Sequence, residues 1–138
     1  MRQADGRALW LGNAGDLRDA RAILNAGVEA VVELADSEPL AALPRHLVRC
    51  RFPLSDGGDN PSLLLRLAVE SVAALLRADI PVLVCCSGGM SRSVSVSAAA
   101  VALVEGRELG DSLKEVVGSG PADVSPALFL QLRDVVGQ

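Results

Sequence analysis

A thiol and a guanidinium separated by five residues stand near the centre of this 138-residue chain. They belong to the segment Cys86–Ser93, which reads CSGGMSRS and lies between an apolar run, 80–85, and a helix-like run, 94–104. A buried strand would carry the Cys86 thiol to a short loop, and the loop would lead into a helix. That arrangement suits covalent phosphoryl transfer, because a thiolate attacks phosphorus while Arg92 binds two phosphate oxygens through its planar fork.

The loop itself is expected to bind phosphate. Its backbone N–H groups can turn inward around a tetrahedral oxyanion as a nest. The N-terminus of the following helix adds unpaired amides and the positive end of the helix dipole, which favour both a bound anion and a thiolate. Two glycines let the backbone approach phosphate closely. The expected phosphate-binding residues are Ser87, Gly88, Gly89, Met90, Ser91 and Arg92.

Each reactive residue also has a purely structural explanation. A cysteine at the end of a strand is often a small buried hydrophobe, and Ser93 is typical of a helix N-terminus. Arg92, however, is unfavourable in the first turn of an apolar helix unless an anion is present, since it stands at the positive end of the dipole. That mismatch favours a ligand-binding role for Arg92. The glycine pair, the arginine six positions on and the helix start together favour a catalytic role for Cys86.

The leaving oxygen needs a proton, and no histidine adjoins the nucleophile to supply it. A carboxylate on a mobile loop is the expected donor. Asp56 follows the strand-like run 52–55, and Asp59 lies three positions further on in the same glycine-containing loop. Both fit this chemistry, and both residues are also common in exposed turns.

These features resemble the protein tyrosine phosphatase superfamily, and in particular its small dual-specificity branch. Cys86, Arg92 and Ser93 match the signature Cys-x5-Arg-Ser, and weaker matches follow in the expected order over most of the chain, at 8–13, 27–34, 52–56 and 126–132. The resemblance implies that Asp56, in preference to Asp59, is the general acid. It also implies that Ser93 hydrogen-bonds the thiolate and eases departure of sulfur from the phosphocysteine.

The chain departs from that pattern immediately before the nucleophile. Many members have histidine there, thought to hold the loop and tune the thiol, whereas this chain has Cys85. The departure motivates an alternative, a pseudophosphatase that binds phosphorylated partners without turnover. The intact Cys86, Arg92 and Asp56 favour an enzyme. A disulfide between Cys85 and Cys86 would be strained.

Composition argues against several other classes of function. The net charge of −4 offers no basic footprint for nucleic acid and no basic run suited to an acidic membrane surface. Neither His46, expected at the surface, nor the cysteines, with Cys50 and Cys85 expected in the core, show zinc-ligand spacing. We therefore expect no metal and no cofactor. Three cysteines and the lack of an apolar signal core at the amino terminus favour a cytoplasmic location.

Predicted strands alternate with predicted helices along the chain, which indicates one α/β domain over residues 1–138. Strands are expected at 8–11, 28–34, 47–54 and 80–85. Helices are expected from Asp16 to about Ala26, from Pro61 with Asn60 as N-cap, and at 93–105, 112–117 and 125–136. These elements form a three-layer sandwich with a central, mostly parallel sheet, like that of the phosphotyrosine phosphatases. The segment Cys86–Ser93, called the reactive loop below, would then lie at the carboxyl end of the sheet, where ligands bind.

The sequence therefore predicts a cysteine-dependent phosphatase of dual-specificity type that forms a phosphocysteine on Cys86. Phosphotyrosine and phosphoserine or phosphothreonine on proteins are the substrates that the resemblance implies. A non-protein phosphoester, such as a phosphoinositide, an RNA 5′ end or a phosphometabolite, is the alternative substrate. The physiological substrate and the oligomeric state stay open.

Overall fold

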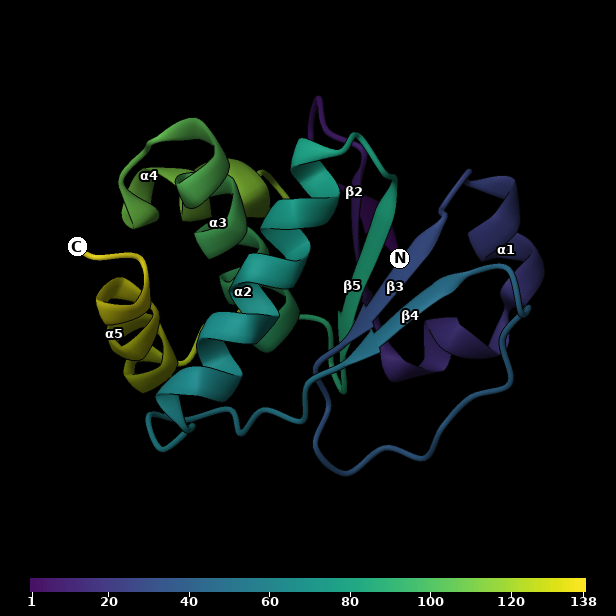
Figure 1. The fold of residues 1–138 in the computed structure, drawn as a ribbon, viewed down its shortest axis with the longest axis horizontal. Helices are drawn as coiled ribbons and strands as arrows, with labels where there is room; N and C mark the ends of the chain where they lie inside the picture. The colour runs from purple at the N-terminus through teal and green to yellow at the C-terminus, as the bar shows by residue number, and fades with distance from the viewer.

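The computed structural model describes all 138 residues as a sheet with helices on both faces (Figure 1). The sheet has the order β1-β2-β5-β3-β4, in which β1 runs antiparallel to β2 and all other pairings are parallel. Its strands are β1 (Arg2–Gln3), β2 (Leu9–Asn13), β3 (Ala30–Glu33), β4 (Val48–Arg51) and β5 (Val82–Cys86). The helices are the 3-10 helix η1 (Ala14–Arg18), α1 (Ala20–Asn25), α2 (Ser62–Arg77), α3 (Arg92–Glu105), α4 (Leu109–Val117) and α5 (Pro126–Val135). The predicted α/β fold with a mostly parallel sheet is confirmed.

Strand β5 lies at the centre of the sheet, between β2 and β3, and all its residues are buried. Its continuous apolar sequence is typical of a parallel strand covered on both faces. The register places Asn13 of β2 beside Cys86 and Glu33 of β3 beside Cys85. Because these strands are parallel, their carboxyl ends meet at one edge of the sheet. The reactive loop begins at that edge, as the sequence predicts.

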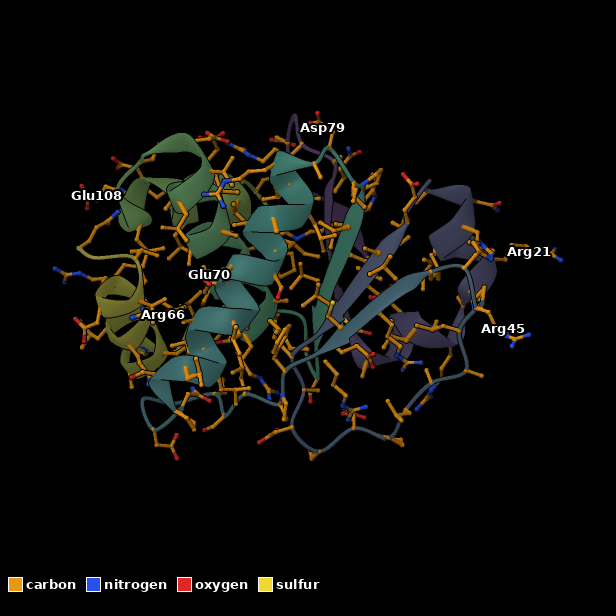
Figure 2. The ribbon with its side chains drawn as sticks, in the orientation of Figure 1. Arg21, Arg45, Arg66, Glu70, Asp79 and Glu108 are labelled. Carbon is orange, nitrogen blue, oxygen red and sulfur yellow. The ribbon has the colours of Figure 1, made fainter.

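Helices α2, α3, α4 and α5 cover one face of the sheet, whereas η1 and α1 lie on the other (Figure 1). The larger core contains 25 buried residues and includes Cys86. The smaller core contains seven and includes Cys85. Successive side chains of a strand point to opposite faces, so the two neighbouring thiols enter different cores. Figure 2 shows charged side chains such as Arg66, Glu70 and Glu108 on the outside of the layers.

Helix α3 is buried through eleven residues, Arg92 to Ala102. Serine and alanine dominate this stretch, and such small side chains allow the helix to pack closely against α2, α4 and the sheet. The helix ends at Gly106, whose φ of +65° gives it the left-handed conformation common after a last turn. This packing fixes the α3 N-terminus at the reactive loop. None of the helices combines the length and the apolar character needed to cross a lipid bilayer.

The single helix predicted from Asp16 to about Ala26 begins later in the structure, at Ala20. Two elements occupy the stretch, η1 and then α1, and Asp19 caps α1 by accepting a hydrogen bond from the Ala22 N–H at 3.0 Å. The Asp16 carboxylate instead accepts from the Asn13 N–H at 2.8 Å, in a reciprocal capping box. The hydrogen bond that Asp19 accepts from the Ala22 N–H begins a separate helix and so divides the segment.

The predicted N-cap of α2 is also wrong. Pro61 occupies the cap position, and the Asn60 side chain makes no bond to the helix. Its amide accepts from the Ser55 N–H at 2.8 Å and donates to the Ser55 and Gly57 carbonyls at 3.0 and 3.2 Å. Asn60 therefore closes the loop before α2, which is the loop that carries Asp56.

Candidate active site

The Cys86 thiol lies under the loop that joins β5 to α3. Its sulfur accepts hydrogen bonds from the Gly89 N–H at 3.2 Å and the Ser93 N–H at 3.5 Å. The Ser93 hydroxyl lies 3.4 Å from the same sulfur. The two amide donors stabilise a thiolate, the form that attacks phosphorus, and the Ser93 hydroxyl, which accepts from the thiol, can rotate to donate to the thiolate.

The carbonyl groups of the loop are held by their surroundings. The Ser87 carbonyl accepts from the Ala14 N–H at 3.4 Å, and the Met90 carbonyl accepts from the Asp123 N–H at 2.8 Å. The Ser91 carbonyl accepts from the Ser95 N–H and hydroxyl in the first turn of α3. With these carbonyls engaged, the amides of the loop between β5 and α3, other than that of Gly89, donate to no protein group and are available to bind an oxyanion.

The two glycines of the loop differ in what the protein requires of them. Gly89 has a φ of +74°, and a Cβ there would lie 2.9 Å from the Gly12 carbonyl oxygen. Both its conformation and its space therefore require glycine. Gly88 has ordinary φ and no atom within 4 Å of an added Cβ, so the protein itself leaves room for a side chain there.

Two oxygen atoms accept hydrogen bonds from Arg92, and the sequence analysis identified neither of them. Its side chain is buried, and Nη1 donates to the Leu54 carbonyl at 2.8 Å and to Asp36 Oδ1 at 3.0 Å. These two bonds use both hydrogens of Nη1. The edge formed by Nε and Nη2 bonds to no protein group and is the edge suited to two oxygens of a phosphate.

The structure brings Asp56 to the loop and leaves Asp59 apart from it. Asp56 Oδ1 accepts a hydrogen bond from the Ser91 hydroxyl at 2.6 Å. That hydroxyl in turn accepts from the Ser125 N–H at 3.0 Å, at the start of α5. Asp59 is exposed and its side chain makes no hydrogen bond. Of the two candidate acids, only Asp56 is hydrogen-bonded to the loop that carries Cys86 and Arg92.

Cys85, the residue in the place of the family histidine, faces away from the loop. Its thiol is buried in the smaller core and donates weakly to the Val32 carbonyl at 3.7 Å. Burial, followed by the negative charges of Glu33, Cys86 and Asp16, raises the pKa of Cys85 from 9.0 to about 12. Cys85 is therefore a core residue, as the sequence predicts, and its thiol stays protonated near neutral pH.

The remaining cysteine and the histidine lie outside the loop. All three cysteines are free; Cys50 is half-buried and packs against the larger core, and His46 is exposed. No three His, Cys, Asp or Glu side chains come together in a group that could hold a metal ion. A cavity of about 140 Å³ adjoins Cys85 and Cys86 between η1 and the segment 35–41, with a mainly apolar lining.

No protein-family model matches this chain, and no curated protein sequence does. Solved structures match it over nearly its whole length. Human DUSP28 has a TM-score of 0.83 and 25% identity, over 95% of this chain and 92% of its own. DUSP15 has a TM-score of 0.77 and 19% identity, over 99% and 87%. OH1 from the Orf virus, described as a tyrosine phosphatase with triple substrate specificity, has a TM-score of 0.74 and 21% identity, over 99% and 86%.

The fold and the loop thus lead to the same group of proteins. A mostly parallel five-stranded sheet flanked by helices is what this chain shares with its structural neighbours, and in this chain the Cys-x5-Arg loop lies at the carboxyl edge of that sheet. The resemblance read from the sequence is confirmed at the level of structure: this chain has the fold of the dual-specificity phosphatases.

Proposed function

We propose that the protein is a cysteine-dependent phosphatase that hydrolyses phosphomonoesters through a phosphocysteine intermediate. One observation carries the proposal: the Cys86 sulfur and the free edge of Arg92 belong to one loop, and the amides between these two residues, other than that of Gly89, are available for an oxyanion. A loop built only for stability would have no need of a buried guanidinium with an unbonded edge.

In the first step, the Cys86 thiolate forms an S–P bond and the bond from phosphorus to the leaving oxygen breaks. Asp56 gives its proton to that oxygen, so the leaving group departs as an alcohol or phenol. Arg92 and the loop amides bind the equatorial oxygens of the transferred group. Positioning and charge stabilisation therefore account for most of the catalysis, as is usual for phosphoryl transfer.

In the second step, water attacks phosphorus and gives a proton to Asp56, which now acts as a base. The S–P bond breaks, and its electron pair returns to sulfur as a thiolate. The Ser93 hydroxyl, 3.4 Å from the sulfur, is placed to stabilise that thiolate as it leaves. Inorganic phosphate is released, and the protons on Cys86 and Asp56 are as they were before the first step. No step in this sequence uses a metal ion.

Phosphotyrosine and phosphoserine or phosphothreonine on proteins are the proposed substrates, and the cytoplasm is the proposed location. The fold of dual-specificity phosphatases supports a phosphoprotein substrate. The exposed positions of Asp56 and Met90 support it further, because they leave the mouth of the loop open to an extended chain.

A substrate panel tests the proposal. Purified protein is assayed with para-nitrophenyl phosphate, phosphotyrosine and phosphothreonine peptides, a phosphoinositide and a nucleoside monophosphate, each with and without EDTA. We expect turnover of the aryl phosphate and the phosphopeptides, unchanged by EDTA. Activity confined to a non-protein substrate would reassign the substrate, and binding of phosphopeptides without any turnover would support the pseudophosphatase. Loss of activity in EDTA would contradict the mechanism.

A further inference from the structure

The carboxylate of Asp36 touches the guanidinium that is proposed to bind phosphate. Asp36 follows β3 at the carboxyl edge of the sheet, 56 residues before Arg92 in the sequence. Its Oδ1 accepts from Arg92 Nη1 at 3.0 Å, while the Leu54 carbonyl accepts from the same nitrogen at 2.8 Å. A planar guanidinium held at one nitrogen by two acceptors in different directions has little freedom to rotate.

The geometry points to Asp36 as a positioning residue, which fixes the Arg92 fork so that its Nε and Nη2 edge faces the phosphate site. This inference rests on the proposed function for the identity of the substrate. The only hydrogen bond and ion pair that the Asp36 side chain makes is with Arg92, and Asp36 acts through it. The negative charge of Asp36 weakens the attraction between Arg92 and a phosphate anion. Any gain in catalysis from Asp36 must therefore come from the orientation of the guanidinium.

The segment that carries Asp36 is itself anchored. Glu33, buried at the end of β3, accepts two hydrogen bonds from Arg49, at 2.5 and 3.1 Å. Arg49 Nη1 then donates to the Ala41 carbonyl at 2.6 Å, and Arg51 donates to the Glu38 carbonyl. Two strand arginines thus hold the backbone just beyond Asp36. Its carboxylate is presented by a fixed segment, which positioning requires.

A competing interpretation makes Asp36 an inhibitor that occupies Arg92 until substrate arrives. An inhibitory carboxylate would take the edge that phosphate needs, as a phosphate mimic. Asp36 instead bonds to Nη1, which the Leu54 carbonyl also occupies, and the Nε and Nη2 edge stays unbonded. The observed contact therefore favours orientation over competition.

The test is a graded series at position 36, Asp36→Glu, Asp36→Asn and Asp36→Ala. Glu38→Gln is the matched control, because it removes a negative charge from the same segment and its side chain makes no hydrogen bond. Two readouts are measured: kcat and KM for para-nitrophenyl phosphate, and the affinity for inorganic phosphate by calorimetry in the Cys86→Ser background. Thermal unfolding of each variant checks that the fold is kept.

We expect Asp36→Ala to lower kcat/KM by about tenfold, the size of one hydrogen bond to a charged group, mainly through kcat. Asp36→Asn should lie between Ala and wild type, Asp36→Glu should recover part of the loss, and Glu38→Gln should equal wild type. Unchanged kcat in Asp36→Ala would overturn the inference, and so would tighter phosphate binding with unchanged or higher kcat.

The two readouts also separate this inference from the proposed function. If wild type shows no turnover but Asp36→Ala still weakens phosphate binding, the phosphatase proposal fails and the positioning role stands. If wild type turns over and Asp36→Ala matches it in both readouts, the phosphatase proposal stands and the positioning role fails. If wild type neither turns over nor binds phosphate, both fail.

Discussion

Cys85 and Cys86 are neighbours in one strand, equally buried, and surrounded by opposite chemistry. Around the Cys86 sulfur lie two N–H donors and a hydroxyl. Around Cys85 lie a carbonyl acceptor and the carboxylates of Glu33 and Asp16, which help raise its pKa to about 12. The two thiols therefore have the same solvent exposure but different hydrogen-bond partners, and burial is the largest cause of the raised pKa of Cys85. The alternation of β5 assigns one thiol to each environment.

The largest effect expected from this contrast is on turnover. Cys86→Ser should lower kcat by about 10⁴-fold or more, because a serine hydroxyl is a poor nucleophile without a base beside it. Cys85→Ser should stay within a few-fold of wild type, since that side chain faces the other core. Steady-state assays of both variants with para-nitrophenyl phosphate make the comparison. Equal losses in the two variants would mean that Cys85 also takes part in the reaction.

Arg92→Lys should lower kcat/KM by about 10³-fold. A lysine ammonium can replace the contacts to Leu54 and Asp36, so the fold should be kept, but it cannot offer two parallel N–H donors to phosphate. Arg66→Lys, on the exposed side of α2, is the matched control and should be neutral (Figure 2). Activity of Arg92→Lys within a few-fold of wild type would mean that Arg92 has only a structural role in the helix.

Asp56→Asn should lower kcat/KM, which reports the first step, by about 10²-fold for phosphoserine and much less for activated aryl esters. A good leaving group departs as an anion, so the loss should grow with the pKa of the leaving group. The basic limb of the pH–rate profile should flatten in this variant.

Asp59→Asn is the paired control for the acid. It should keep both the leaving-group dependence and the pH profile of wild type, because the Ser91 hydroxyl holds Asp56 alone at the loop. If Asp59→Asn shows the leaving-group dependence and Asp56→Asn does not, the general acid is Asp59. If neither variant shows the dependence, the loop supplies no proton and the pseudophosphatase gains support.

The smallest effect concerns Cys85 and stability at high pH. The folded protein keeps a proton on this thiol between about pH 9 and pH 12, where an unfolded chain loses it. More protons in the folded state mean that the free energy of unfolding falls as pH rises through this window, by at most about 1.4 kcal/mol per pH unit. Urea unfolding at a series of pH values should show a shallower decline for Cys85→Ser than for wild type and Cys50→Ser. An identical slope in all three would contradict the assigned environment of Cys85.

The sequence predicted the reactive loop and its place in the fold because both depend on local patterns. An apolar run, a glycine-containing segment and a helix-like run follow one another between residues 80 and 104. The partners of Arg92 were missed because Asp36 and Leu54 lie 56 and 38 residues away in the sequence. Only the strand order, β5 beside β3 and β3 beside β4, brings them together. A usable signal did exist for Asp36, since it is an acidic residue just beyond a predicted parallel strand.

Other errors arose where local interactions compete. Asp16, Asp19 and Asn60 can each cap a helix, and the sequence alone does not say which hydrogen bond is made. The structure assigns Asp19 to α1, Asp16 to the Asn13 N–H and Asn60 to its own loop. Choosing Asp56 over Asp59 likewise depended on resemblance until the contact with Ser91 supplied a physical reason.

Trapping the intermediate tests the central claim most directly. The Asp56→Asn variant, slowed in the hydrolytic step, is mixed with para-nitrophenyl phosphate and quenched in acid, and its tryptic peptides are fragmented in a mass spectrometer. Cleavage after Arg77 and Arg92 leaves both neighbouring cysteines on one peptide, so fragmentation must place the phosphoryl group between them. The account predicts one phosphoryl group on Cys86 and none on Cys85. A phosphoryl group on Cys85, or turnover with no phosphocysteine under any quench condition, would contradict it.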